Sequence, residues 1–178
     1  NWRSGLNCAI ILASGNSTRF NSEIPKQFNK LNGRMLMDYP IQTFSECNEI
    51  DRLIIVVPEK FRIEIQDAYP DHSVVSGGSS RKESAFNGLL ACPTETEKVL
   101  IHDAARAMVD DSIITRCFEA LDYAQAVSTV VPTKDTVVEL KGNIIVNMPI
   151  RNNIFLEQTP QGFHYQTILK AHTTIQVD

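Results

Sequence analysis

The 178 residues are enough for one domain with a substantial core and too few for two domains of ordinary size. Hydrophobic residues make up 43% and charged residues 21%, as in ordinary globular proteins, and the net charge of −4 argues against a nucleic-acid partner. The longest apolar run near the start is too short to span a bilayer, so no membrane partner is expected. Four separated cysteines without a C-x-x-C pair are typical of reduced thiols in a cytoplasmic protein.

Strand-like and helix-like segments alternate along the first 131 residues. Apolar runs predict buried strands at 8–12, 53–57, 73–75, 99–101 and 127–131. Helical patterns are found at 39–47, at 61–68, around 85–90 and after a capping residue at 110–112. Because apolar strands interleave with amphipathic helices, we predict an α/β fold. Its Rossmann-like, mostly parallel sheet would carry helices on both faces.

The segment 134–154 interrupts this alternation. Strand-like runs at 136–140 and 144–148 flank Lys141-Gly142-Asn143, which is good hairpin-turn chemistry. Isolated hairpins are marginally stable, so the hairpin is expected either to pack on something such as a second subunit or to extend the edge of its own sheet. The sequence thus predicts one domain over 1–178 that carries 134–154 as a protruding hairpin arm.

The loop after the first strand combines a glycine with two cations. Backbone N–H groups at such a strand end can hold phosphate oxygens, and Arg19 and Lys26 follow seven residues apart. A single glycine does not match the dinucleotide-binding fingerprint, and Lys26 is not preceded by glycine as in a P-loop. By itself, the loop fits a phosphate cradle and an ordinary connection equally well.

Polar residues follow four of the expected strands, and ligands of such folds bind beyond the carboxyl ends of the strands. The residues expected at this rim are Ala13 to Arg19, Gly77, Gly78, Arg81, His102, Asp103, Arg106, and Lys134 to Thr136. Several cations with a carboxylate suit a phosphorylated substrate and a divalent metal. Asp103 fits either an ion pair or helix cap, or a Mg²⁺ ligand. His102 is expected to be structural rather than a base.

Five ordered blocks carry a family resemblance. They are LASG at 12–15 with Arg19 and PKQF at 25–28, GGSSR at 77–81 with Ser84, VLIHDAAR at 99–106, PTKDT at 132–136 and QTPQGF at 158–163. The chain, from about 8 to 171, therefore resembles the cytidylyltransferases of the isoprenoid pathway. Those enzymes make 4-diphosphocytidyl-2-C-methyl-D-erythritol from methylerythritol 4-phosphate and CTP, releasing pyrophosphate.

The resemblance implies a role for each matched position. Arg19 and Lys26 would be catalytic and face the triphosphate, while Asp103 would hold Mg²⁺. The residues implied to bind the nucleotide are Ala13, Ser14, Gly15, Gly78, Arg81 and Ser84. Those implied to receive the polyol phosphate are Arg106, Thr136, Arg151 and Thr159. The Thr159-Pro160-Gln161 segment also fits a plain connection between a strand and a helix.

The resemblance also implies a partner subunit, and the chain departs from the family pattern at several positions. In the family the arm reaches across a homodimer, so Thr136 and Arg151 would serve a neighbour's site. Ser14 and Ala107 stand where alanine and proline are usual, and 16–18 replaces a more glycine-rich turn. Family members continue with an acidic helix and a strand that bears a lysine and a metal-binding aspartate. We therefore expect this C-terminal part of the family fold to be absent from the chain.

Two other functions fit the same residues. Pentitol-phosphate cytidylyltransferases, which make CDP-ribitol, share the blocks, although HDAAR at 102–106 favours the methylerythritol enzyme. A non-catalytic nucleotide-binding or dimerisation module is the alternative from another class. Cations crowded at one rim favour an enzyme over such a module.

Overall fold

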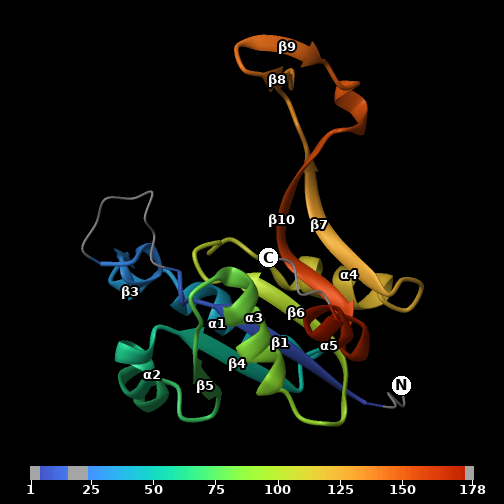
Figure 1. Cartoon of the computed structure of the whole chain (residues 1–178). Coiled ribbons are helices and arrows are strands. Elements are labelled where there is room, and N and C mark those ends of the chain that lie inside the picture. Colours follow the sequence, from blue (N-terminus) through green and yellow to red (C-terminus); the bar gives the residue numbers. More distant parts are fainter. Residues whose placement is uncertain (1–4, 16–23, 175–178) are drawn as a thin grey trace.

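A computed structural model describes residues 5–15 and 24–174 of the chain (Figure 1). Its main sheet has six strands in the order β5-β4-β1-β6-β10-β7. These are β1 (Leu6–Leu12), β4 (Arg52–Val57), β5 (Ser73–Ser76), β6 (Thr96–Asp103), β7 (Ala126–Pro132) and β10 (Phe155–His164). β1 pairs in parallel with β4 and β6, and β4 pairs in parallel with β5. The predicted mostly parallel sheet is confirmed.

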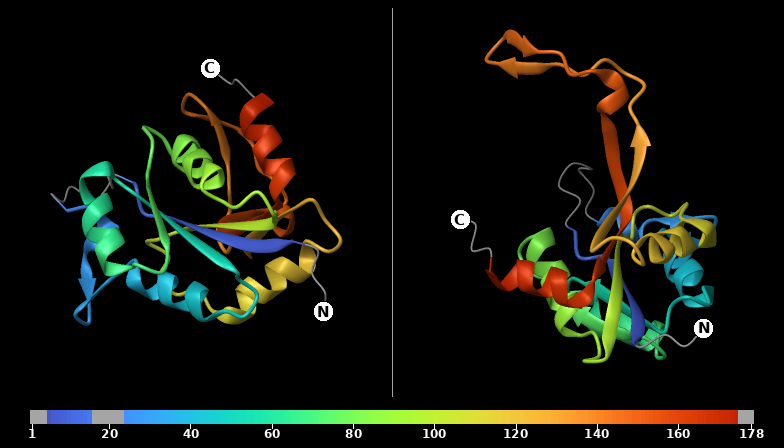
Figure 2. Two further views of the ribbon diagram at one scale, coloured as in Figure 1. Left: turned by 90° about the horizontal axis from the view of Figure 1, so that it is seen from below. Right: turned by 90° about the vertical axis from the view of Figure 1, so that its right-hand side faces the viewer.

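Helices cover both faces of this sheet, as predicted. They are α1 (Asp38–Glu46), α2 (Arg62–Ala68), α3 (Arg81–Leu90), α4 (Asp111–Ala120) and α5 (Tyr165–Thr174). Figure 2 shows α3 and α5 on one side of the sheet and α1 and α4 on the other. None of the helices in the described ranges is long and apolar enough to cross a membrane.

The two layers of helices create two apolar clusters, one on each face of the sheet. Successive residues of a strand point to opposite faces, so Ile11 of β1 packs with Phe44 and Ile114 of α1 and α4. Its neighbour Ile10 packs with Leu89 of α3 on the other side. Because both faces of β1 are buried, this strand reads as an uninterrupted apolar run rather than as an alternating one.

β10 and α5 are the main elements that the sequence analysis did not identify. β10 lies between β6 and β7 and is antiparallel to both. Its Gly162 pairs with Leu100 and Val127, and a Cβ there would lie 2.7 Å from Val127 Cγ2. The interpretation of 159–161 as a strand-to-helix connection is wrong, because these residues lie inside β10 and α5 begins only at Tyr165. Since β10 runs against β6, its first half lies at the end where β6 finishes.

The predicted hairpin forms a sheet of its own. β8 (Glu139–Lys141) and β9 (Ile144–Asn147) pair with each other, and Gly142 adopts a φ of 62° at the turn. The hairpin projects beyond β7 and β10, away from the helices (Figure 1). The alternative of an edge extension of the main sheet is therefore wrong. We use the term arm for residues 134–154.

Shorter elements complete the described part of the chain. They are η2 (Lys26–Phe28), β2 (Lys30–Leu31), β3 (Arg34–Met35), η3 (Glu59–Phe61) and η4 (Arg151–Asn153).

Candidate active site

The loop that follows β1 is held by its backbone and by one side chain. The Ala13 N–H donates to the Val56 carbonyl at 2.7 Å. The buried Gln27 amide nitrogen donates to the carbonyls of Ala13 at 2.5 Å and Gly15 at 2.9 Å. Gln27 therefore ties η2, which begins at Lys26, to this loop. Gln27 belongs to the PKQF block, but the sequence analysis gave it no role. Arg19 lies outside the described residues.

A second loop, after β5, touches the first one. The Gly77 N–H donates to the Val57 carbonyl at 2.8 Å, and the Gly78 N–H donates to Ser84 Oγ at 3.1 Å. Ser84 Oγ also accepts a hydrogen bond of 2.8 Å from the Ser14 hydroxyl. A Cβ at Gly77 would lie 2.3 Å from the Cβ of Ser14, so only glycine allows this approach. The structure thus brings together Ser14, Gly78 and Ser84, which were predicted to bind the nucleotide.

The first turn of α3 is fixed at the same rim. Ser80 is its N-cap and accepts a hydrogen bond from the Glu83 N–H at 3.1 Å. The Glu83 carboxylate accepts from both the backbone N–H and the hydroxyl of Ser79, and these bonds lower the pKa of Glu83. Arg81 and Ser84 lie on this turn, so the caps of α3 position two of the predicted nucleotide-binding residues.

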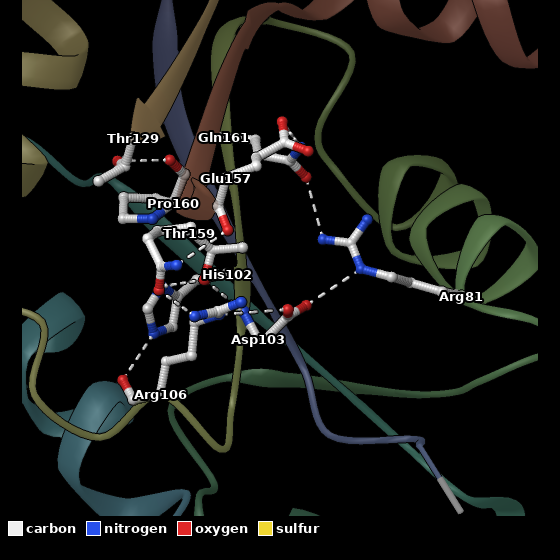
Figure 3. A network of polar contacts seen from close by, with 10 residues as sticks. Arg81, His102, Asp103, Arg106, Thr129, Glu157, Thr159, Pro160 and Gln161 are labelled. Carbon is white, nitrogen blue, oxygen red and sulfur yellow. Dashed lines mark hydrogen bonds and ion pairs between the residues drawn. The ribbon is translucent and has the colours of Figure 1, made fainter. Parts of the chain in front are cut away.

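The Asp103 carboxylate lies between two arginines (Figure 3). Arg81 Nε is 3.1 Å from its Oδ1, and Arg106 Nε is 3.6 Å from its Oδ2. The ion pair that was considered for Asp103 and Arg106 is therefore present. The Asp103 side chain is 33% exposed, so each of its two ion pairs is partly screened by water and contributes little to stability. Their effect is to hold one anion and two cations together at the rim.

Two glutamines of β10 contact these arginines. Gln161 Oε1 accepts a hydrogen bond from Arg81 Nη2 at 3.0 Å, and the Gln158 side-chain oxygen accepts one from Arg106 Nη1. The Gln161 amide also donates to the Glu157 carboxylate at 2.7 Å (Figure 3). The sequence analysis recognised the QTPQGF block but missed these two glutamines. Their spacing gave no signal, because their arginine partners come from the turn after β6 and from α3.

His102 and Thr159 lie beneath this layer. His102 is fully buried, its Nε2 is 3.1 Å from the Arg106 carbonyl, and its Nδ1 is 3.0 Å from Thr159 Oγ1. A carbonyl oxygen only accepts, so Nε2 carries the proton and Nδ1 accepts from the Thr159 hydroxyl. Burial lowers the pKa of His102 to about 4, so its ring is neutral at neutral pH. Both ring nitrogens are thus occupied, as expected of a structural histidine rather than a base.

The residues predicted to receive the polyol phosphate are only partly brought together. Arg106 lies at the rim and the buried Thr159 lies directly beneath it, and each of them contacts Asp103. Thr136, between β7 and β8, and Arg151, in η4, are exposed and belong to the arm. Within the described residues, neither of them hydrogen bonds to Arg106 or Thr159. Their assignment stays a prediction that depends on a second subunit.

Comparison with known proteins identifies the family. The family model for 2-C-methyl-D-erythritol 4-phosphate cytidylyltransferase matches residues 7–178. A Clostridium botulinum protein of that name is 36% identical over 96% of this chain and 77% of the relative. A bifunctional ribulose 5-phosphate reductase/CDP-ribitol pyrophosphorylase of Haemophilus influenzae is 33% identical over 93% of this chain and 37% of its own length.

Solved structures agree with this match. The crystal structure of 4-diphosphocytidyl-2C-methyl-D-erythritol synthase from Anaerococcus prevotii superposes with a TM-score of 0.86 at 25% identity, covering 98% of this chain and 78% of that one. The 2-C-methyl-D-erythritol 4-phosphate cytidylyltransferase of Francisella tularensis gives a TM-score of 0.76 at 30% identity, covering 94% and 76%. From its sequence blocks, its fold and these matches, the chain belongs to the 2-C-methyl-D-erythritol 4-phosphate cytidylyltransferase family.

Proposed function

We propose that this protein transfers the cytidylyl group of CTP to 2-C-methyl-D-erythritol 4-phosphate and releases pyrophosphate. Membership of the family supports the reaction. The observation that carries the proposal is the contact between the loop after β1 and the first turn of α3, through Ser14 and Ser84, beside a carboxylate flanked by two arginines. Loop N–H groups, cations and an acid at one rim are what a nucleoside triphosphate and a second phosphate require.

The reaction needs no covalent intermediate. A phosphate oxygen of the polyol phosphate attacks the α-phosphorus of CTP in line, the bond to the bridging oxygen breaks, and pyrophosphate leaves. Negative charge grows on the α-phosphoryl oxygens and on the leaving group, where Arg19, Lys26 and the loop N–H groups would neutralise it. The nucleophile is already an anion, so no general base is required. This agrees with a His102 ring whose two nitrogens are both occupied.

Residues at this rim would bind the two substrates. Ala13, Ser14 and Gly15 would wrap the nucleotide, Gly78 and Ser84 would read the cytosine edge, and Arg81 would lie beside the phosphates. Arg106 and Thr159 would receive the polyol phosphate together with Thr136 and Arg151 from a second subunit.

We also propose a homodimer formed through the arm, supported by exposed apolar side chains there, such as Ile144 at 71% and Met148 at 62%. Buried free thiols at all four cysteines support a cytoplasmic location.

Asp103 is the proposed Mg²⁺ ligand. No group of three or more His, Cys, Asp or Glu side chains arranged to hold a metal is present within the described residues. Mg²⁺ is often held by one or two carboxylates plus substrate phosphates, so a single partly exposed carboxylate fits an ion that arrives with the triphosphate. When bound, the ion would offset charge on the phosphates, while Arg81 and Arg106 keep Asp103 at the rim.

The assignment is tested by incubating the protein with CTP, Mg²⁺ and one polyol phosphate at a time, and measuring pyrophosphate release. We expect faster release with methylerythritol 4-phosphate than with ribitol 5-phosphate. Preference for ribitol 5-phosphate would favour the alternative supported by the relative from Haemophilus influenzae. Binding of CTP by calorimetry without pyrophosphate from either acceptor would contradict the enzyme and favour a nucleotide-binding module.

A further inference from the structure

We infer that His102 is a positioning residue for cytidylyl transfer, which works through the Thr159 hydroxyl. Together they fix the backbone turn from Asp103 to Arg106, from which the Asp103 carboxylate and the Arg106 guanidinium extend. The inference rests on the proposed function, since it assigns a task within that reaction. Thr159 then acts from beneath the rim as well as through any contact with substrate.

The geometry is a closed ring of hydrogen bonds around the turn that ends β6. The Asp103 N–H donates to Thr159 Oγ1 at 3.2 Å, and the Thr159 hydroxyl donates to His102 Nδ1 at 3.0 Å. His102 Nε2 donates to the Arg106 carbonyl at 3.1 Å, and the Arg106 N–H donates back to the Asp103 carbonyl at 3.0 Å. Because the four bonds close a ring, a shift of one of these residues would strain or break a bond to the next.

The two side chains in this ring of hydrogen bonds are shielded from water. His102 is fully buried and Thr159 is 8% exposed, so water does not readily replace a lost bond. The neutral imidazole supplies one donor and one acceptor, whose separation is fixed by the planar five-membered ring. Phe44 of α1 packs against this imidazole with ring centroids 5.1 Å apart. The imidazole is therefore held by packing as well as by hydrogen bonds.

The turn carries two side chains that the proposed reaction needs at a fixed separation. Asp103 is the proposed metal ligand, and Arg106 is the proposed contact of the acceptor phosphate. A change in the β6 turn would move one relative to the other. Catalysis between two bound phosphates is sensitive to such shifts, because a displacement of about 1 Å can cost on the order of 100-fold in rate.

Substitutions of His102 separate positioning from mere stability. His102→Leu replaces the imidazole with an apolar side chain and removes both hydrogen bonds, whereas His102→Gln supplies an amide donor and acceptor in their place. We expect kcat to fall on the order of 100-fold in His102→Leu and much less in His102→Gln. The KM for CTP should change little, because the contacts between Ser14, Gly78 and Ser84 are untouched.

Substitutions of Thr159 test the same inference independently. Thr159→Val keeps the shape and loses the hydroxyl, and Thr159→Ser restores it. We expect Thr159→Val to reproduce the fall in kcat and Thr159→Ser to recover most of it. The double variant His102→Leu/Thr159→Val should be no slower than either single variant, because both remove the same unit.

Tyr165→Phe is the matched control. Its buried hydroxyl donates to the Leu89 carbonyl at 2.9 Å, in the apolar cluster that contains α3 and α5. Losing this bond should lower Tm without lowering kcat. A purely structural His102 would behave in the same way, with lower Tm and unchanged kcat.

The outcomes distinguish the inference from the proposed function. If the wild-type protein releases no pyrophosphate with either polyol phosphate, the proposed function fails and the inference fails with it. If the wild type is active and Thr159→Val keeps its kcat, the inference is overturned while the function stands. The comparison of Thr159→Val with Thr159→Ser carries the test even if His102→Leu does not fold.

Discussion

At the scale of single residues, the rim is organised before any substrate arrives. Asp103 already lies between two guanidinium groups, and the Gln27 side chain already holds two carbonyls of the first loop. Polar groups that are in place at the start of a reaction need no reorganisation when charge develops, which is the main source of electrostatic catalysis. Individual side chains at this rim should therefore affect turnover more than they affect stability.

Lys26→Ala tests the predicted catalytic cation. Loss of an ammonium group that faces the developing charge should lower kcat on the order of a hundredfold in a folded protein. Lys170→Ala, an exposed lysine on α5, is the control and should leave kcat unchanged. Steady-state kinetics and Tm measure both. A Lys26→Ala enzyme with wild-type turnover would remove this lysine from the mechanism.

Gly77→Ala tests the contact between the two loops. The added methyl group would lie 2.3 Å from Ser14 Cβ and 2.9 Å from Ser84 Oγ, so the loops must move apart. Overpacking of this kind costs about 1–3 kcal/mol, and here the cost falls on the nucleotide pocket. We expect CTP affinity to fall on the order of tenfold or more by calorimetry. Unchanged affinity would show that the contact does not shape the pocket.

At the scale of elements, β10 is the strand on which the rim is assembled. Gln158, Thr159 and Gln161 contact Arg106, Asp103 and Arg81 respectively, so one strand aligns groups from β6, from the turn after it and from α3. The α3 helix contributes its capped first turn. The rim is therefore sensitive to changes in either element that do not touch a ligand.

Ser80→Ala tests whether the cap of α3 supports the nucleotide pocket. Losing an N-cap serine should destabilise the protein by about 1 kcal/mol and loosen the turn that carries Ser84. Asp110→Ala, which removes the cap of α4, is the matched variant. Both should lower Tm, whereas only Ser80→Ala should weaken CTP binding. Equal CTP affinities in the two variants would separate the α3 cap from nucleotide binding.

At the scale of the whole molecule, the arm is the segment of the described chain that gathers many exposed apolar side chains. Its exposed side chains include Leu140, Ile144, Ile145, Val146, Met148 and Ile150. Many exposed apolar side chains on one segment are typical of an interaction site, and a second copy of the chain is the partner that we propose. The division into one domain, 1–178, with an arm at 134–154 stays a prediction.

Ile144→Asp tests the arm as the dimer contact. A carboxylate buried without a partner in an apolar interface is strongly unfavourable, so we expect a dimeric wild type and a monomeric variant. Ile63→Asp is the matched control, because Ile63 on α2 is 69% exposed and Ile144 is 71% exposed. Sedimentation at several concentrations measures both. A wild type that stays monomeric throughout would contradict the proposed homodimer.

The sequence by itself determined the features that depend on neighbouring residues. Alternation of apolar strands with amphipathic helices predicted the parallel sheet, Asp110 was among the predicted caps of α4, and Gly142 marked the hairpin turn. Each is a local preference of the backbone, so a short window of sequence contains it. The five blocks likewise gave the family and most of the residues at the rim.

The tertiary structure decided where distant segments meet. Gln161 pairs with Ile101 and with Ser128, and nothing in the residues around it selects those partners. The sequence analysis therefore left Thr159-Pro160-Gln161 open between a substrate-binding segment and a plain connection, although side chains of β10 are what hold Asp103, Arg81 and Arg106 together. Strand pairing joins residues far apart in the chain through backbone groups that all residues share, so only the folded chain shows which strands become neighbours.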